Sequence, residues 1–362
     1  MTNRDRQPTG PLAGVRVLDL SSVVSGPMTA MVLADQGADV IKVEPPGWGD
    51  GIRYLGATHR GVSAIFCMIN RNKRSLALNW KAPAGAALVR RLAAEHDVVL
   101  QNYRPGKLER AGLGYADLCV DNPGLIYASI SGMGEVGPLA EQKVFDYVIQ
   151  GISGATDAQG PESPAMIRTI VYDKVTALTA AQAITAALYA RSQDPAGNGQ
   201  HLRLSMLDAA LQFNWPELMW NHSFVDDSPA IERAGDLADM YAVSPTSDGA
   251  VVSHRLGGDT REYSTDTLME LFATHDVPIA RANKRREVAS DPQVVASGAL
   301  EEYAHRRAGR LRQPRSAARF EGTPVGTLHP APEVGEHTID IIEELGLTED
   351  EIRDLVTQGA LG

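Results

Sequence analysis

Short apolar runs of strand length recur along the first part of the chain and are separated by stretches in which apolar residues recur at helical spacing. The predicted strands cover residues 15–20, 38–44, 76–78, 98–102, 125–131 and 201–206. Most of them are apolar over nearly their whole length rather than at alternate positions. Such strands, alternating with helices, are typical of a parallel sheet covered on both faces. We therefore predict an α/β fold.

The predicted helices begin and end at residues that suit those positions. A helix over 28–36 follows Ser25-Gly26-Pro27, in which Ser25 is an N-cap candidate, and Gly37 suits the end of this helix. Pro83 opens a second helix that runs to about residue 95. A third, longer helix is predicted over 174–191, ahead of the strand at 201–206.

Residues from about 225 to 320 are more charged than the rest of the chain. They contain a strand pattern of their own over 241–254 and a helical pattern near 265–275. We predict that this region, 226–319, is a second and smaller α+β domain, because the chain is long for a single domain. Two short amphipathic helices close the sequence, and the second begins with a capping box at Thr348.

Composition narrows the range of functions. Hydrophobic residues make up 43% of the chain and charged residues 22%, which are ordinary values for a globular protein. The net charge of −11 argues against nucleic acid as a partner, although a local basic site can still bind an anionic ligand. We find neither a signal-peptide pattern nor an apolar run long enough to cross a membrane, and we expect a soluble cytoplasmic protein.

The cysteine and histidine positions give no sign of a metal or disulfide framework. Cys67 and Cys119 lie far apart, and no Cys/His cluster has metal-ligand spacing. We therefore expect no bound metal.

Residues 132–137 match the GxGxxG pattern of dinucleotide-binding folds. In those folds a helix begins inside the motif, so that its N-terminus faces the pyrophosphate. Here Pro138 follows the last glycine and a helical pattern starts only later. We therefore do not predict NAD or FAD binding from this motif.

Ten sequence blocks, taken together and in order, resemble the class III CoA-transferases, the family of formyl-CoA transferase, carnitine CoA-transferase and α-methylacyl-CoA racemase. The blocks are PLAGVRVLDL (11–20), SGPMTAMVLADQGADVIKVEPP (25–46), NRNKRSLALNWK (70–81), DVVLQNYRPGKLERAGLGY (97–115), NPGLIYASISGMGEVGP (122–138), KVFDYVIQGISG (143–154), VYDKVTALTAAQAITAALYAR (171–191), GNGQHLRLSMLDA (197–209), GTPVGTLHPAPEVGEHT (322–338) and IIEELGLTEDEI (341–352). The resemblance is weak between about 215 and 320.

The resemblance implies a Rossmann-like large domain built from both chain ends, here 1–225 and 320–362, with the small domain between them. It also implies a homodimer whose two subunits interlock. The implied partners are an acyl-CoA donor and a carboxylic acid acceptor. Coenzyme A would be a substrate, and no tightly bound cofactor is implied.

Asp173 stands immediately before the predicted helix 174–191. Local sequence allows two interpretations: a helix N-cap, or a carboxylate kept ionised by the helix N-terminus and able to attack a thioester. In the family that the chain resembles, the aspartate at the position of Asp173 is the nucleophile. The resemblance thus implies an aspartyl anhydride and an aspartyl–CoA thioester at Asp173.

Transferase and racemase chemistry need different residues on this fold. Racemisation requires a second acid/base group, and the racemase pattern has His directly before Asp where this chain has Phe145-Asp146. A phenyl ring carries no transferable proton, so a CoA-transferase is preferred and a racemase is the alternative. A non-catalytic CoA-binding protein remains a third possibility, because the middle of the chain matches poorly. Val24 replaces the glutamine of formyl-CoA transferase, which argues against a formyl or oxalyl substrate.

A CoA site needs cations for phosphates, backbone donors and an apolar slot. Each Lys or Arg in such a set could equally be an ordinary solvated charge. Position by position, the resemblance assigns the CoA site to Val23, Leu78, Lys81, Asn102, Tyr103, Arg110 and Lys143.

Overall fold

The computed structural model describes residues 9–160, 162–226, 228–326 and 328–362, which form two compact units. The first unit contains the chain up to Leu211 together with Glu302–Leu311 and Ser316–Gly362. The second contains Gln212–Glu301 and Arg312–Arg315. In the described residues, no helix is both long enough and apolar enough to cross a membrane.

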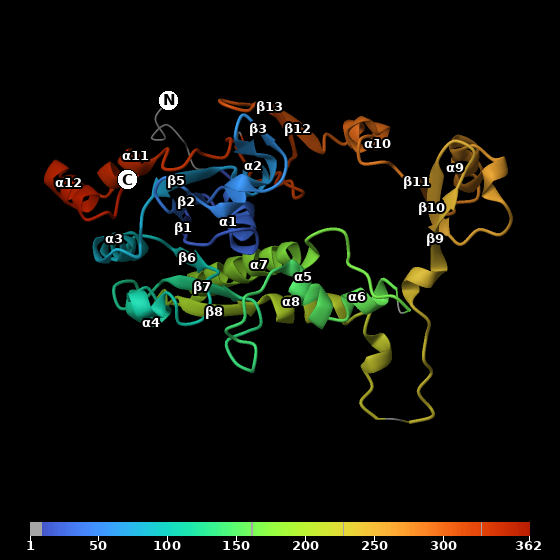
Figure 1. The fold of residues 1–362 in the computed structure, drawn as a ribbon, viewed down its shortest axis with the longest axis horizontal. Coiled ribbons are helices and arrows are strands. Elements are labelled where there is room, and N and C mark those ends of the chain that lie inside the picture. Colours follow the sequence, from blue (N-terminus) through green and yellow to red (C-terminus); the bar gives the residue numbers. More distant parts are fainter. Residues whose placement is uncertain (1–8, 161, 227, 327) are drawn as a thin grey trace. The chain divides into compact units, whose positions relative to one another are not determined.

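A six-stranded parallel sheet forms the centre of the first unit, in the order β5-β2-β1-β6-β7-β8 (Figure 1). Its strands are β1 (Arg16–Asp19), β2 (Asp39–Glu44), β5 (Lys73–Ala77), β6 (Val98–Gln101), β7 (Ile126–Ser131) and β8 (Gln200–Ser205). The predicted parallel sheet is confirmed, and each predicted strand overlaps an observed one. The chain runs from β1 to β2 on one side, and β6 lies on the other side of β1. The carboxyl ends of β1 and β6 therefore flank a topological switch point, where ligands gather in open α/β sheets.

Both faces of the inner strands β2, β1, β6 and β7 are buried, which explains why these strands are mostly apolar, while the edge strand β8 is partly exposed. Successive side chains point to opposite faces, so Val17 and Val98 enter one core while Leu18 and Val99 enter the other. The first core contains residues of α1 (Ser25–Asp35) and α7 (Val171–Gln193). The second contains residues of α3 (Pro83–Ala94) and α11 (Thr338–Glu344). Each buried aliphatic side chain contributes about 1.5–3 kcal/mol to this packing.

Shorter elements complete the first unit. They are β3 (Thr58–His59), β4 (Val62–Ser63), α2 (Ala64–Asn70), α4 (Tyr115–Leu118), α5 (Asp146–Ile152), α6 (Ala155–Ala158) and α12 (Glu349–Thr357). Three further elements, α8 (Met206–Asn214), β12 (Leu300–His305) and β13 (Gly309–Pro314), continue across the division between the units. The capping box predicted at Thr348 is present at the start of α12.

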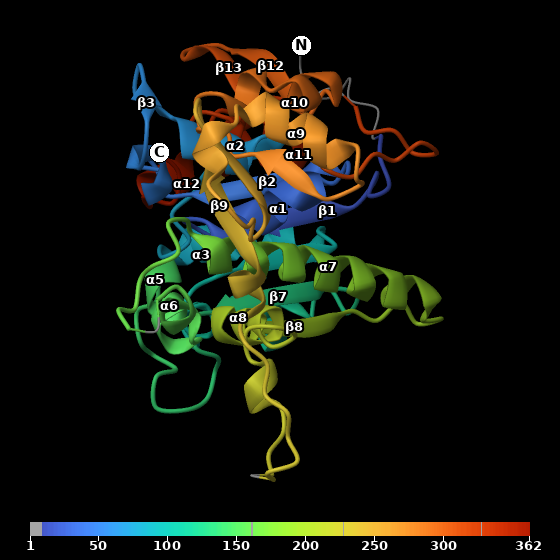
Figure 2. The same cartoon turned by 90° about the vertical axis from the view of Figure 1, so that its right-hand side faces the viewer.

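The second unit contains an antiparallel sheet in the order β11-β10-β9, whose strands are labelled in Figure 1; Figure 2 shows β9 and the helix α9 from another side. Its strands are β9 (Tyr241–Pro245), β10 (Ala250–His254) and β11 (Ile279–Arg281), and its helices are α9 (Thr265–Ala273) and α10 (Pro292–Ala296). The strand pattern predicted over 241–254 is thus a hairpin of two strands, because a turn interrupts it between Pro245 and Ala250.

Two helix starts differ from the prediction. Ser25 is the first residue of α1 rather than its N-cap, since Val24 occupies the cap position without a side-chain hydrogen bond. Helix α7 begins at Val171, so Asp173 lies within its first turn instead of ahead of it.

Candidate active site

A cavity of about 560 Å³ opens at the carboxyl ends of the strands around β1, β6 and β7. It is lined by the loop after β1, the loop after β6, the segment that follows β7, and the starts of α7 and α8. The lining residues are Ser22, Val23, Val24, Ser25, Asn102, Tyr103, Arg104, Pro105, Lys107, Arg110, Ile130, Ser131, Gly132, Ala140, Gln142, Lys143, Val144, Phe145, Asp173 and Met206. This is the switch point at which the sheet topology places a ligand site.

The structure brings most of the predicted site residues to this cavity and leaves two outside its lining. Asp173 lines it together with Val23, Asn102, Tyr103, Arg110 and Lys143. Leu78 is instead fully buried, where it forms a β-bridge with Leu361. Lys81 is exposed and is not among the lining residues.

Two cations of the cavity, Arg104 and Lys107, were missed by sequence reasoning although they stand in the same loop as Arg110. Lys107 Nζ lies 4.3 Å from the Tyr103 ring centroid. Partial burial, followed by the charges of Lys81, Arg104 and Arg110, lowers the pKa of Lys107. These four cations therefore lie close enough to repel one another, and an anionic ligand relieves such repulsion. The signal that could have found them is the number of cations between residues 104 and 110.

Asp173 is buried at the start of α7, with 9% of its surface exposed. Burial and the nearby Asp146 carboxylate raise the pKa of Asp173 to about 6. The backbone N–H and hydroxyl of Ser25, which lie near this carboxyl, act on its pKa in the opposite direction. Ser25 is the first residue of α1, so the Asp173 carboxyl lies near the N-termini of two helices that pack together.

Asp146 takes the capping role that local sequence allowed for Asp173. Its Oδ2 accepts the backbone N–H of Tyr172 at 2.6 Å and that of Asp173 at 3.2 Å. Its Oδ1 accepts Gln150 Nε2 at 2.5 Å. Because a residue from α5 satisfies these first-turn donors, the Asp173 side chain is not needed to cap its own helix.

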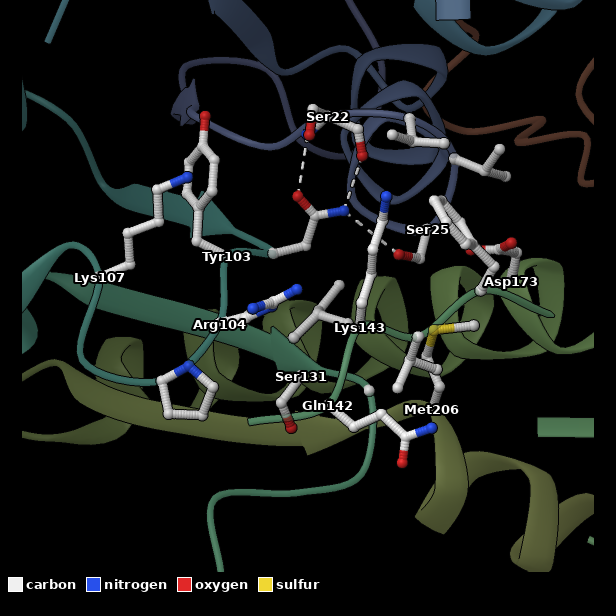
Figure 3. Close-up of a pocket in the computed structure, with 18 of the residues that line it drawn as sticks. Ser22, Ser25, Tyr103, Arg104, Lys107, Ser131, Gln142, Lys143, Asp173 and Met206 are labelled. Carbon is white, nitrogen blue, oxygen red and sulfur yellow. Dashed lines mark hydrogen bonds between the residues drawn. The ribbon is translucent and has the colours of Figure 1, made fainter. Parts of the chain in front are cut away.

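Asn102 lines the cavity and holds the loop after β1, which contains Ser22 and Ser25, labelled in Figure 3. Its Oδ1 accepts the Ser22 N–H at 2.9 Å and its Nδ2 donates to the Ser22 carbonyl at 2.7 Å. Nδ2 also lies 3.4 Å from Ser25 Oγ. Asn102 thus links the end of β6 to the residue that donates to Asp173.

The segment after β7 closes the other side of the cavity without forming a dinucleotide site. No helix begins within residues 132–137, and α5 starts only at Asp146. Phe145 lines the cavity, and Lys143 Nζ lies 5.1 Å from its ring centroid. The phenyl ring therefore occupies the position beside Asp146 where a second acid/base group would be needed.

Comparison with known proteins identifies the family. The model of the CoA-transferase family III matches residues 12–261 and 250–338 of this chain. The chain belongs to this family. The match includes most of the middle region, where the sequence blocks alone gave only a weak resemblance.

Curated relatives of this CoA-transferase match over nearly their whole length. Human succinyl-CoA:glutarate CoA-transferase is 32% identical over 97% of this chain and 90% of the relative. The succinyl-CoA–D-citramalate CoA-transferase of Chloroflexus aurantiacus is 30% identical over 96% and 97%. Among solved structures, a CaiB/BaiF family protein from Brucella suis superimposes with a TM-score of 0.80 at 29% identity, covering 93% of this chain and 100% of that one. The chain is thus an acyl-CoA:carboxylate CoA-transferase of family III.

Proposed function

We propose that this CoA-transferase works through covalent intermediates on Asp173. One observation carries the proposal: a buried carboxyl faces the cavity with hydrogen-bond donors on one side, while another residue caps its helix. A pKa of about 6 leaves the group roughly nine-tenths ionised at pH 7, as a nucleophile requires.

The exchange then proceeds through balanced acyl-transfer steps. An Asp173 oxygen attacks the thioester carbonyl, the carbon–sulfur bond breaks, and a mixed anhydride and the CoA thiolate result. The thiolate attacks the aspartyl carbonyl, which releases the first carboxylic acid and leaves an aspartyl–CoA thioester. The carboxylate of the acceptor attacks the carbonyl of this thioester, the carbon–sulfur bond breaks, and a second mixed anhydride and the CoA thiolate result. The thiolate then attacks the acyl carbonyl of this anhydride, which forms the new acyl-CoA and releases the Asp173 carboxylate. Ser25 also lines the cavity, and we assign its N–H and hydroxyl to stabilising the negative charge that develops on the reacting carbonyl.

We assign CoA to the basic side of the same cavity. Arg104, Lys107 and Arg110 carry the charge that the phosphates need, and Lys81 is close enough to perturb Lys107. Tyr103 and Val23 offer apolar surface, and Lys143 extends along the segment after β7. Leu78 contacts the ligand only if the bound molecule reaches beyond the described cavity.

For the acids, we propose dicarboxylates. The names of the human and Chloroflexus aurantiacus relatives give succinyl-CoA as donor, with glutarate or D-citramalate as acceptor. All are dicarboxylic, and the cations of the cavity suit a second carboxylate. We also expect a homodimer, as the family resemblance implies.

Racemase chemistry on this fold is disfavoured by Phe145. A two-base mechanism needs a proton carrier on each face of the α-carbon. Phe145 carries no such proton, and the neighbouring Asp146 carboxyl is occupied by the first turn of α7.

Intact-protein mass spectrometry with a panel of acyl-CoAs, succinyl-CoA included, tests the proposal. The expected result is a CoA-sized adduct that hydroxylamine releases and that peptide mapping places at Asp173. Asp173→Asn, which keeps the size of the side chain, should bind CoA but form no adduct. A CoA adduct that persists in Asp173→Asn would refute the assignment. Exchange of the substrate α-proton without an adduct would favour the racemase.

A further inference from the structure

The loop between β1 and α1 contains a residue in an unusual backbone conformation. Val23 has φ of 70°, in the left-handed region that a β-branched residue adopts only under constraint. Such a conformation is strained and persists only where surrounding contacts hold it. Val23 lines the cavity and stands two residues before Ser25, which lines the same cavity as Asp173 and lies near its carboxyl.

A buried ion pair supplies the contacts that hold this loop. Each carboxylate oxygen of Asp50 lies 3.1 Å from the Val23 backbone nitrogen, which donates to them. Lys42 Nζ donates to Asp50 Oδ2 at 2.9 Å and to the Ser21 carbonyl at 3.1 Å. The Lys42 and Asp50 side chains are 0% and 2% exposed. Burial alone would raise the pKa of Asp50, but Lys42 and the backbone donors hold it below its usual value.

Stability alone does not explain a buried ion pair at this place. Taking two charges out of water costs several kcal/mol per ion, and an apolar pair of similar volume is often as stable or more so. What this pair does that an apolar pair could not is bind backbone groups on both sides of Ser22. Asn102 binds Ser22 itself, so three successive residues of the loop are held by side chains.

We propose that Lys42 and Asp50 are positioning residues for CoA transfer: they hold Val23 in its left-handed conformation and thereby direct the Ser25 donors at Asp173. Neither residue lines the cavity, so they act through the loop and not on the substrate. The proposal rests on the role proposed above for Asp173. It predicts that weakening the pair changes the environment of the Asp173 carboxyl as well as the stability of the protein.

Asp50→Asn tests this, because it keeps the size of the side chain and removes the charge that pairs with Lys42. Asp35→Asn is the matched control: Asp35 is also a buried carboxylate, paired with Arg71 at the other end of α1. The measurement is the titration of the Asp173 carboxyl by carbon-13 NMR, assigned with Asp173→Asn. We expect the pKa of Asp173 to rise in Asp50→Asn, because the Ser25 donors that lower this pKa move out of position. The pKa of Asp173 should stay unchanged in Asp35→Asn. The rate of adduct formation should fall about tenfold or more in Asp50→Asn.

An unchanged Asp173 titration in folded Asp50→Asn would overturn the proposal. If Asp50→Asn does not fold, the double variant Asp50→Asn/Val23→Gly decides, because glycine adopts a positive φ without strain. Recovery of folded protein then supports the proposal, and continued unfolding overturns it. The titration does not depend on turnover. Failure of the wild-type protein to form the Asp173 adduct would refute the proposed mechanism. The titration of Asp173 would still test the positioning role of Lys42 and Asp50.

Discussion

Two buried carboxyl groups lie at the start of α7, and their hydrogen-bond partners separate their roles. Asp146 accepts two backbone N–H groups and a glutamine side chain, so its oxygens are occupied. Asp173 lies near Ser25 and faces the cavity. Burial, followed by the charge of Asp146, makes the Asp173 carboxyl more costly to ionise and raises its pKa. Asp173 is therefore the carboxylate that is open to a thioester.

The raised pKa of Asp173 predicts how the reaction depends on pH. The rate of adduct formation from a saturating acyl-CoA should be constant above pH 7 and fall below about pH 6, because the protonated carboxyl cannot attack. Single-turnover kinetics between pH 5 and 8 measures this. A rate that stays constant down to pH 4.5 would contradict the assigned nucleophile.

The same shift predicts that Asp173 destabilises the folded protein at neutral pH. The folded-state pKa of about 6 exceeds the ordinary aspartate value of 3.8, so the folded state binds more protons between these values. The contribution of Asp173 to stability is therefore fully present below about pH 4 and is lost as the pH rises through 6. Asp173→Asn should unfold at a higher temperature than wild type at pH 7.5, by at most about 3 kcal/mol in free energy. At pH 4 the difference should vanish, and thermal melts at both pH values check this.

At the scale of elements, the site depends on how α1 and α7 begin. The helices pack along their length, and Thr29 of α1 donates through Oγ1 to the Ala177 carbonyl of α7 at 3.2 Å. Their N-termini carry partial positive charge, which favours an anion between them. The cap of α7 is supplied by α5, so one element positions the nucleophile of another.

Removal of the Asp146 cap should destabilise α7 and also lower the pKa of Asp173. Asp146→Ala deprives two first-turn N–H groups of their acceptor, which should cost about 1–2 kcal/mol of stability. It also removes the charge that helps to raise the pKa of Asp173, so the acid limb of the rate profile should move to lower pH. Denaturant unfolding and the pH profile measure the two effects. Asp157→Ala, at an exposed position on α6, is the control and should change neither.

At the scale of the whole molecule, sequence pattern was sufficient for the elements and insufficient for the contacts between them. The strand predicted over 98–102 is β6 (Val98–Gln101), because the β-branched and apolar run Val98-Val99-Leu100 favours a buried strand. The interaction of Asp146 with α7 joins residues far apart in sequence, so no local pattern records it. For the same reason, local sequence alone allowed Asp173 to be interpreted as the N-cap of its helix.

The candidate site was predicted by matching positions of this chain to the family. Two residues, Leu78 and Lys107, show the limits of this matching. Matching by position placed Leu78 in the CoA site, yet its side chain is buried in the core. It omitted Lys107, whose role depends on the fold of a loop that places it near Arg104 and Arg110, with Lys81 from another segment also close. The predicted domain division at 225 and 320, and the interlocked dimer, stay predictions.

The cation cluster makes a prediction about ligand binding by the intact protein. Lys107→Ala should weaken CoA binding several-fold and flatten its dependence on salt, because one charge fewer attracts the phosphates. Lys284→Ala removes an exposed lysine of the second unit and should leave affinity and salt dependence unchanged. Isothermal titration with CoA at low and high salt measures both variants against wild type. Since the pKa of Lys107 is lowered by its neighbours, CoA binding should also draw protons onto it at alkaline pH, which buffers of different ionisation enthalpy detect. Equal affinity and salt dependence in Lys107→Ala and wild type would place the phosphates elsewhere.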